Sequence, residues 1–331
     1  MFDGKKILIT GGTGSLGTAL TKRLLNENVD TIRIFSRDEL KQVEMQSKIK
    51  DDRLRFLIGD VRDKERLSRA LEDVNIVFHT AALKQVPVAE YNPFEAVKTN
   101  VYGAQNLIDS CYDQNVEKVI AVGTDKAVSP LNTYGATKML MERLFISANF
   151  WRGKHDIKFI CVRYGNVLGS RGSILPLFNE QIKNGKKLTI TDPSMTRFNV
   201  TMNQALDLIY RAAKEGVGGE VFIPKLKSYR VDVLVSAIQE LKNSSNELDI
   251  IGARPGEKFH ESLINKDELR YTYETNLDYI LLDQNSVLSE GRDFSHLKRV
   301  STLTDQYSSN NVELLTKEEL KEILTNEDLI Q

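Results

Sequence analysis

The sequence TGGTGSLG at residues 10–17 follows an apolar, strand-like run at residues 5–10 and precedes apolar residues at helical spacing. Its glycines Gly11, Gly14 and Gly17 lie three residues apart. Between a strand and a helix, such glycines allow a sharp turn, close approach of a pyrophosphate to the backbone, and tight helix packing. The helix N-terminus offers free N–H groups to the phosphates. We therefore predict a dinucleotide-binding turn made by Gly11, Thr13, Gly14, Ser15, Leu16 and Gly17.

Strands and helices alternate after this turn. Strand-like apolar runs recur at residues 31–36, 54–60, 75–82, 117–124 and 158–164, and helical patterns lie at 38–50, 64–72 and 94–115. Near-continuous apolar strands that alternate with helices are typical of a parallel sheet buried on both faces. The sequence therefore predicts an α/β fold with a doubly wound parallel (Rossmann) sheet. A P-loop is excluded, because Thr18 and Ala19 follow Gly17 where that motif has Lys and then Ser or Thr.

The pattern divides the chain into two parts. We expect a dinucleotide-binding domain at residues 1–165 and a smaller C-terminal substrate-binding domain with a helical tail at residues 166–331, from which a strand and a helix can return to the sheet. The second part has helical patterns at 177–183, 203–214 and 232–241 and strand-like runs at 188–191 and 221–224. In the tail, Thr316 and Glu319 have the spacing of a capping box, which predicts a structural helix.

Composition limits the class of protein. The 331 residues include 41% hydrophobic and 27% charged residues, as in ordinary globular proteins. A formal net charge of −1 gives no reason to expect nucleic acid or an anionic membrane as a partner, and no apolar run reaches the ~20 residues of a membrane span. The chain enters a strand without a signal-peptide pattern. Cys111 and Cys161 stand alone and the four histidines lack metal-ligand spacing, so we expect a cytoplasmic protein with buried thiols and no metal.

The end of the second strand bears on the choice of cofactor. About twenty residues after the glycine turn, NAD-binding proteins carry an acidic residue that holds the ribose 2′-hydroxyl. Here Ser36 and Arg37 come first, and the guanidinium fork of Arg37 suits a 2′-phosphate. We therefore predict NADP, although the neighbouring Asp38 leaves NAD open and a solvated Arg37 is the alternative. The cofactor residues expected here are Ser36, Arg37, Asp38, Glu39, Leu40 and Lys41.

The next two strand ends are also expected to line the cofactor. The third strand ends in GDV at residues 59–61, a carboxylate and an apolar side chain suited to the edge of an adenine ring. The fourth ends in TAALK at residues 80–84, where small residues let a ligand lie close to the backbone. The residues predicted at the cofactor from these two segments are Asp60, Val61, Thr80, Ala81, Ala82 and Lys84.

Tyr134 and Lys138 form a Y-x-x-x-K pair on one face of a helix. An ammonium beside a phenol stabilises the phenolate, so the tyrosine can serve as a general base for a substrate hydroxyl. The spacing alone is weak evidence, because Tyr210 and Lys214 share it. Position separates the two pairs: Tyr134 opens a helix just after the fifth strand, at the expected cofactor edge, whereas Tyr210 lies in a helix predicted to serve packing.

The fifth strand ends in GTDKAVSP, which places Asp125 and Lys126 side by side a few residues before Tyr134. A simple alcohol dehydrogenase needs only a hydroxyl here, and Thr124 can supply it. It needs no additional acid and base. The alternative is a surface ion pair that caps the loop, but the carboxyl end of a central strand favours a catalytic role.

Nine blocks in this order carry a resemblance: TGGTGSLG, SRDELKQ, GDVRDKERL, AALKQVPVAEYNP, KTNVYGAQN, TDKAVSPLNTYGATK, RYGNVLGSRGS, MTRF and RPGEKFHE. With them the chain resembles the extended short-chain dehydrogenase/reductases that act on nucleotide sugars, and among these the inverting UDP-N-acetylglucosamine 4,6-dehydratases of the pseudaminic acid pathway type. The resemblance runs from Met1 through the helical tail. Retaining relatives commonly carry Met at the position of Tyr134, and many are membrane-anchored. We also expect a homo-oligomer.

The resemblance implies roles at matching positions. Tyr134 and Lys138 would act at the C4 hydroxyl and the nicotinamide ribose. Asp125 would be the acid at the C6 hydroxyl and Lys126 the base at C5, with Asn100 organising the lysine and its water. The residues that would hold the nucleotide sugar are Lys84, Asn166, Arg171, Arg197, Arg254 and Glu257.

Two further positions follow from the resemblance. Val167 would face the cofactor. Thr80 departs from the family, whose members often have Ala there, and an extra hydroxyl near the cofactor should be tolerated.

These residues suit a redox-neutral reaction. Oxidation of C4 acidifies the C5 proton, which Lys126 can remove while Asp125 protonates the departing C6 hydroxyl. The same cofactor then returns the hydride to C6, and reprotonation of C5 from the opposite face inverts that centre, so no external reductant is consumed. The alternatives are a retaining 4,6-dehydratase, a nucleotide-sugar 4-epimerase, and a non-catalytic NADP-binding sensor on the same fold. The Asp125–Lys126 pair argues against the epimerase.

Overall fold

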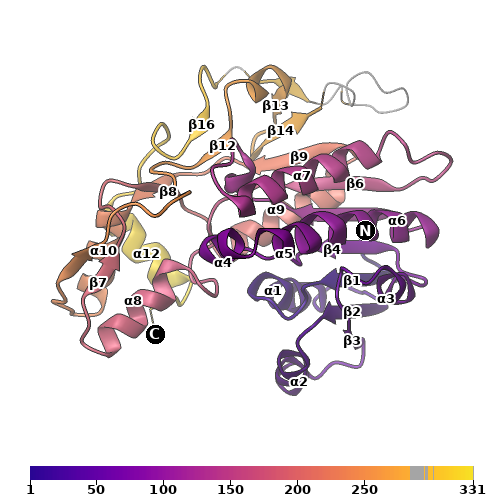
Figure 1. Ribbon diagram of the computed structural model, residues 1–331, viewed down its shortest axis with the longest axis horizontal. Coiled ribbons are helices and arrows are strands. Elements are labelled where there is room, and N and C mark those ends of the chain that lie inside the picture. Colours follow the sequence, from indigo (N-terminus) through magenta and orange to yellow (C-terminus); the bar gives the residue numbers. More distant parts are fainter. Residues whose placement is uncertain (284–293, 295–296, 301, 331) are drawn as a thin grey trace.

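A ten-stranded sheet forms the centre of the computed structural model, which describes residues 1–283, 294, 297–300 and 302–330 (Figure 1). Six strands have the order β3-β2-β1-β4-β5-β6 and are parallel, which confirms the predicted Rossmann sheet. They are β1 (Lys6–Thr10), β2 (Thr31–Ser36), β3 (Leu54–Ile58), β4 (Ile76–His79), β5 (Lys118–Val122) and β6 (Lys158–Val162).

The sheet continues beyond β6 with strands from the second half of the chain. The strand β9 lies parallel to β6, and β14, β13 and β15 add antiparallel strands beyond it. These strands are β9 (Glu220–Pro224), β13 (Thr272–Glu274), β14 (Asp278–Leu282) and β15 (Lys298–Arg299). The second half therefore returns to the sheet with β9 and with α9, which packs on β5 and β6.

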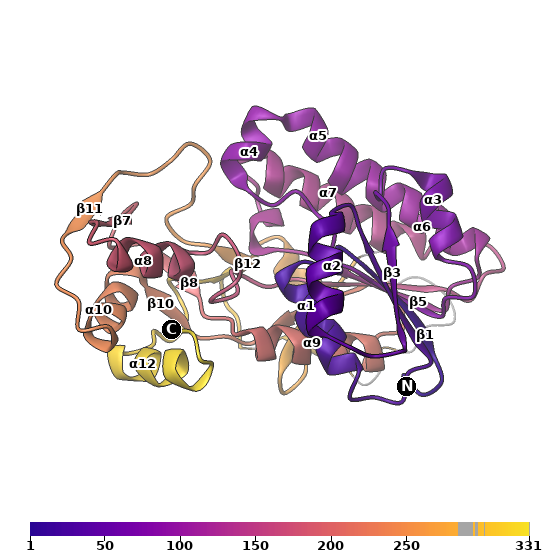
Figure 2. The same cartoon turned by 90° about the horizontal axis from the view of Figure 1, so that it is seen from below.

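Helices cover both faces of the sheet (Figure 2). One face carries α1 (Ser15–Leu24), α2 (Glu39–Lys48) and α9 (Met202–Glu215), whose apolar residues share a core with alternate residues of β1, β2 and β4. The other face carries α3 (Lys64–Ala70), α6 (Gly103–Asp113) and α7 (Thr133–Ala148) over a second core. Burial on both faces explains why these strands are apolar along almost their whole length.

Several predicted strands extended too far. The third, fourth and fifth strands end at Ile58, His79 and Val122, not at residues 60, 82 and 124. Most residues beyond these ends are small, but the chain no longer pairs with neighbouring strands there and forms the loops at the carboxyl edge of the sheet. Similarly, the predicted helix at 94–115 is α5 (Pro93–Val97), a π-helical turn η1 (Lys98–Tyr102) and α6, preceded by an unpredicted α4 (Val86–Tyr91). Single π turns inside helices are frequent at functional sites.

Part of the second half, around α8, α10 and α12, forms a smaller lobe with its own apolar core, seen at the left of Figure 1. Thr316 and Glu319 form the predicted capping box at the start of α12, which packs on α10. The elements outside the sheet are α8 (Ile174–Lys183), β7 (Leu188–Ile190), β8 (Thr196–Phe198), β10 (Ser228–Arg230), α10 (Val231–Leu241), β11 (Leu248–Ile250), β12 (Ser262–Ile264), η3 (Glu268–Tyr271), β16 (Tyr307–Ser308) and α12 (Lys317–Asn326).

Two further findings concern the cysteines and the helices. Cys111 and Cys161 are both free and buried, as predicted. None of the helices in the described part of the chain is both long and apolar enough to span a bilayer.

Candidate active site

The glycine turn is built for close contact with a ligand and with the neighbouring strand. Gly11 has a φ of +67°, and a Cβ there would lie 2.8 Å from the Cα of Ala81. A Cβ on Gly17 would lie 2.6 Å from the Cα of Gly12, so α1 packs directly on the turn. Gly14 caps α1 without a side-chain hydrogen bond to its first amides, whereas Asp38 and Asn132 cap α2 and α7 with their side chains. The first amides of α1 are thus left for a phosphate.

Arg171 was predicted to hold the substrate, and the structure places it directly on the glycine turn. Its backbone N–H and its Nε reach the hydroxyl of Ser15, at 3.2 and 3.4 Å, and its guanidinium donates to the carbonyl of Thr13. Lys84 in turn donates to the carbonyl of Arg171, at 3.0 Å. Two cations therefore lie where the loop after β6 meets the dinucleotide-binding turn, and both suit a diphosphate.

At the end of β2, Asp38 and Arg37 have different partners. The carboxylate of Asp38 accepts from the backbone N–H of Lys41 at 3.1 Å and from its ammonium at 2.6 Å, and these bonds lower its pKa. Arg37 is about half exposed and lies 3.4 Å from the carboxylate of Asp60, which Arg62 also holds. The carboxylate of Asp38 thus already caps α2, whereas the guanidinium of Arg37 is accessible to solvent.

The segment after β4 is fixed from two sides. The hydroxyl of Thr80 donates to the carbonyl of Thr10 at 2.7 Å, so the side chain that departs from the family joins the ends of β4 and β1. Asn100, fully buried in the π-helical turn, accepts from the N–H of Leu83 at 2.9 Å and donates to its carbonyl at 3.0 Å. Asn100 also donates to Thr137 on α7. It therefore holds the loop after β4 against the helix that carries Tyr134.

Tyr134 lies in the first turn of α7, buried and next to the end of β5. Burial raises the pKa of its phenol, whereas a hydrogen bond with Thr124 and the charge of Lys126 lower it. Gly135 makes this approach possible, because a Cβ there would lie 2.2 Å from the carbonyl oxygen of Lys126. Sequence reasoning missed Gly135, although a glycine directly after the tyrosine was visible.

Lys138 shares the helix face with Tyr134, but its contacts differ from the expected ammonium–phenol pair. Its ammonium is buried and donates to the carbonyl of Val122 at 2.7 Å. Burial lowers the pKa of Lys138 to about 8. The charge of Lys126, on the adjacent turn, lowers the pKa of the Tyr134 phenol. By contrast, Tyr210 packs against Phe2 and Arg23, as predicted for a packing helix.

Asp125 and Lys126 form the 3₁₀ turn η2 (Asp125–Ala127) at the carboxyl end of β5. Asp125 is buried, accepts from the hydroxyl of Thr124 at 2.9 Å and from the ammonium of Lys126 at 3.1 Å, and keeps a second oxygen without a hydrogen-bond partner among the described residues. Burial raises the pKa of this carboxyl although Lys126 opposes the shift. Lys126 also donates to Asn166, at 2.9 Å. The pair is thus not a solvated surface ion pair.

Glu261 completes this cluster and was not singled out from the sequence. It precedes β12, is 2% exposed, and its carboxylate lies 3.1 Å from the ammonium of Lys126. Burial alone would lower the pKa of Lys126, but the charges of Asp125 and Glu261 outweigh it and raise that pKa. The block RPGEKFHE contained this glutamate, yet nothing in its spacing linked it to Lys126.

The remaining predicted substrate residues lie on the side of the smaller lobe. Arg197 in β8 is nearly buried and approaches Glu257 at 3.5 Å, while Arg254 is exposed at the start of the same loop. Glu257 accepts from the hydroxyl of Thr191. Val167, predicted at the cofactor, is buried in a bridge to Val200. The structure therefore brings Arg197 and Glu257 together, whereas Arg254 remains exposed to solvent.

A network centred on Arg163 anchors α7. This buried residue follows β6, and its guanidinium pairs with Glu142 of α7 at 2.5 Å and with Glu268 of η3 at 3.0 Å. It thus ties the helix of Tyr134 to the sheet edge and to the second half of the chain.

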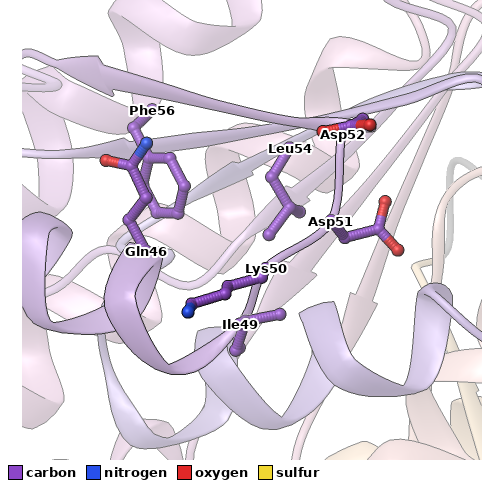
Figure 3. A pocket seen from close by; sticks show the side chains of 7 residues that line it. All are labelled: Gln46, Ile49, Lys50, Asp51, Asp52, Leu54 and Phe56. Atoms are coloured by element: carbon purple, nitrogen blue, oxygen red, sulfur yellow. The ribbon is translucent and has the colours of Figure 1, made fainter.

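A surface pocket of about 420 Å³ lies away from this site, at the end of α2 and the start of β3 (Figure 3). Its Asp51 is paired with Arg53 at 2.8 Å. We assign it no part in the chemistry, since its lining includes none of the residues above. That lining consists of Gln46, Ile49, Lys50, Asp51, Asp52, Leu54 and Phe56.

Comparison with known proteins places the chain in a family. Residues 7–282 match the family described as "Polysaccharide biosynthesis protein". An inverting UDP-N-acetylglucosamine 4,6-dehydratase of Campylobacter jejuni is 45% identical, over 98% of this chain and 99% of the relative. A UDP-glucose 4-epimerase of Rickettsia rickettsii is 42% identical over 100% and 98%. An uncharacterized membrane protein of Methanocaldococcus jannaschii is 48% identical over 98% and 96%.

Solved structures agree with the fold. The X-ray structure of Pen from Bacillus thuringiensis is 40% identical, with a TM-score of 0.93 and full coverage of both chains. A dTDP-glucose 4,6-dehydratase of Streptomyces venezuelae, solved with NAD and TYD, has a TM-score of 0.70 at 22% identity and covers 77% of this chain and 86% of that one.

These findings confirm the predicted resemblance and support the predicted enzyme class, a nucleotide-sugar 4,6-dehydratase, which is a hydro-lyase. The chain belongs to the polysaccharide biosynthesis protein family, within the short-chain dehydrogenase/reductases.

Proposed function

We propose that this protein removes water from UDP-N-acetylglucosamine between C4 and C6 in a redox-neutral, NADP-dependent reaction that inverts C5. The product would be a UDP-2-acetamido-2,6-dideoxy-4-keto-hexose for surface glycans of the pseudaminic acid type. The 45% identity to inverting dehydratases over nearly the whole chain supports this proposal.

The observation that carries the proposal is the buried group of Tyr134, Asp125 and Lys126 at the end of β5. A nicotinamide dinucleotide bound at the glycine turn supplies the hydride acceptor and donor. Tyr134 takes the proton of the C4 hydroxyl. Burial raises the pKa of Asp125 and so favours its protonated form, which would give its proton to the leaving C6 hydroxyl. Lys126 takes the C5 proton, which the C4 ketone makes acidic.

A 4-epimerase is the second candidate, because relatives that are 42% identical bear that name. An epimerase needs the base at C4 but leaves the C5 and C6 bonds intact. It would have no use for a buried acid with a free oxygen beside a lysine, which is what Asp125 and Lys126 provide. We therefore favour the dehydratase.

The choice of NADP is supported by the end of β2. An acidic residue selects NAD when its carboxylate accepts the 2′-hydroxyl. The carboxylate of Asp38 is already occupied by the N–H and the ammonium of Lys41, whereas Arg37 is accessible for a 2′-phosphate.

Incubation with UDP-N-acetylglucosamine tests the function. We expect a product lighter by the mass of one water, with a keto group at C4 and no accumulation of reduced cofactor. NMR coupling constants at C5 then separate the inverted from the retained product. UDP-N-acetylgalactosamine as the product would identify an epimerase instead, and stoichiometric reduced cofactor a plain dehydrogenase.

A further inference from the structure

Lys126 can act as the base at C5 only as a neutral amine, but its surroundings hold it as an ammonium. Its Nζ lies 3.1 Å from oxygens of both Asp125 and Glu261, and 2.9 Å from the amide oxygen of Asn166. The two carboxylates raise the pKa of Lys126 in spite of its burial. A proton must therefore leave Nζ before the amine can accept one from C5.

Glu261 is placed to receive that proton. Its backbone is pinned, since Glu261 N–H donates to the hydroxyl of Ser309 at 3.0 Å and Ser309 N–H donates back to the carbonyl of Glu261 at 2.8 Å. Its Oε1 faces Lys126, and its Oε2 is buried without a hydrogen-bond partner among the described residues. A carboxylate that served structure alone would be expected to have both oxygens satisfied.

We propose that Glu261 accepts the proton that Lys126 must lose before it removes the C5 proton. This inference rests on the proposed dehydration. An N–H bond of Lys126 breaks, its electron pair stays on Nζ, and the proton bonds to Oε1 of Glu261. The lone pair on Nζ then takes the C5 proton while Asp125 protonates the departing C6 hydroxyl, which leaves as water.

The charges balance through both steps. In the form of the site that eliminates water, Asp125 is protonated, Lys126 is an ammonium and Glu261 is a carboxylate, and these charges sum to zero. After the internal transfer all three groups are neutral. After elimination Asp125 is a carboxylate, Lys126 an ammonium and Glu261 an acid, and the sum is again zero. A buried site therefore carries the base without gaining net charge, which burial would penalise.

The other charged groups around Glu261 fit these states. Arg197 of β8 and Lys258 of the preceding loop lower the pKa of Glu261 together with Lys126, while burial opposes them. The carboxyl of Glu261 is thus ionised at rest, and because the same cations weaken it as a base, the proton transfer from Lys126 runs uphill in free energy. The charge of Glu261 adds to burial in raising the pKa of Asp125, which favours the protonated form that the elimination needs. Tyr134 of α7 also lies within reach of the charge of Glu261.

Glu261→Gln tests the proposal in the full-length enzyme with UDP-N-acetylglucosamine, because glutamine keeps the shape but cannot take the proton. C4 oxidation, seen as reduced cofactor in single turnover, should proceed as in the wild type. Deuterium exchange at C5 should fall by ~10²–10⁴-fold at neutral pH. It should recover by about tenfold per pH unit, since Lys126 must now lose its proton to solvent, while the wild-type rate stays flat over the same interval.

The opposite result is equally defined. If Glu261 only stabilises the ammonium, its removal lowers the pKa of Lys126 and makes the amine a better base. Exchange at C5 that is unchanged or faster in Glu261→Gln at neutral pH would overturn the proposal. If the wild type removes no water, the proposed function fails and this inference with it. If the wild type removes water and C5 exchange in Glu261→Gln is unaffected, only the inference about Glu261 is refuted.

Two variants guard against loss of structure. Glu261→Asp keeps the acid but withdraws it by one methylene, so it should restore pH-independent exchange at a reduced rate. A pH profile of Glu261→Asp like that of the glutamine variant would also overturn the proposal. Glu313→Gln removes the carboxylate of an exposed pair with Lys227, which are 2.6 Å apart, and should behave as wild type.

Discussion

The side-chain amide of Asn132 donates a hydrogen bond to the backbone carbonyl of Gly256, at 2.8 Å. Its oxygen meanwhile accepts the N–H of Gly135 at 2.7 Å and caps α7. A single side chain thus connects the helix of Tyr134 to the loop that carries Arg254 and Glu257. This contact therefore fixes the position of that loop relative to α7.

Because of this contact, we expect that substitutions of Asn132 can change substrate binding and stability separately. Asn132→Ala should lose about 1 kcal/mol of stability with the cap and should raise KM for the UDP-sugar. Asn132→Asp keeps the capping oxygen but loses the donor to Gly256, so KM should rise with little loss of stability. Asp63→Ala removes the cap of α3 and serves as the control. Equal KM values for all these variants in steady-state assays would contradict the coupling.

The accessible guanidinium of Arg37 predicts cofactor selectivity. Arg37→Ala should weaken NADP(H) binding by roughly 1.5–3 kcal/mol, the value of a charge-assisted bond, and NAD(H) binding far less. Arg62→Ala is the matched control, because Arg62 also pairs with Asp60 but reaches Glu95 with its other nitrogen. Titration calorimetry measures both cofactors, and equal losses for the two would refute the role of Arg37.

Tyr134 and Lys126 should stop the reaction at different points. Tyr134→Phe removes the hydroxyl that takes the C4 proton, so neither ketone nor reduced cofactor should form. Lys126→Ala leaves that oxidation in place but removes the C5 base, which typically costs 10²–10⁴-fold in the affected step. Cofactor absorbance in single turnover and deuterium incorporation at C5 are the measurements. Wild-type C5 exchange in Lys126→Ala would show that another group is the base.

Burial of Lys138 predicts a cost in stability that depends on pH. The native pKa of about 8 lies below the ordinary lysine pKa of 10.5, so the unfolded chain binds more protons between these values. Stability should therefore rise as the pH rises through this window. Below it, the penalty amounts to at most about 3 kcal/mol. Lys138→Met removes it and loses a hydrogen bond to Val122 worth about 1 kcal/mol, so a net gain of about 1–2 kcal/mol is expected at neutral pH.

Urea unfolding at neutral and alkaline pH tests this balance. The gain from Lys138→Met should shrink as the pH approaches the upper value, and a gain independent of pH would contradict the assignment. Lys214→Met is the control. Lys214 has the same spacing from a tyrosine but is exposed, so its removal should change stability by less than about 0.5 kcal/mol.

The amino-acid sequence alone determined the features whose signals are local. Glycine spacing, apolar strands and the Tyr134–Lys138 spacing each lie within a few residues, where backbone geometry and side-chain period leave a readable pattern. The parallel sheet with helices on both faces followed from the strand–helix alternation. The adjacency of Asp125 and Lys126 was covalent and needed no folding to be seen.

Only the tertiary structure decided which distant groups meet. Glu261 reaches Lys126, and Arg171 reaches the glycine turn, because loops of the second half return to the carboxyl edge of the sheet. Such contacts have no period in the sequence, since the sheet order and the paths of loops set them. Tertiary structure also decided which charges are close: Lys126, on a neighbouring turn, lowers the pKa of Tyr134. These pKa values depend on burial and on contacts between remote segments, and local residue spacing predicts neither.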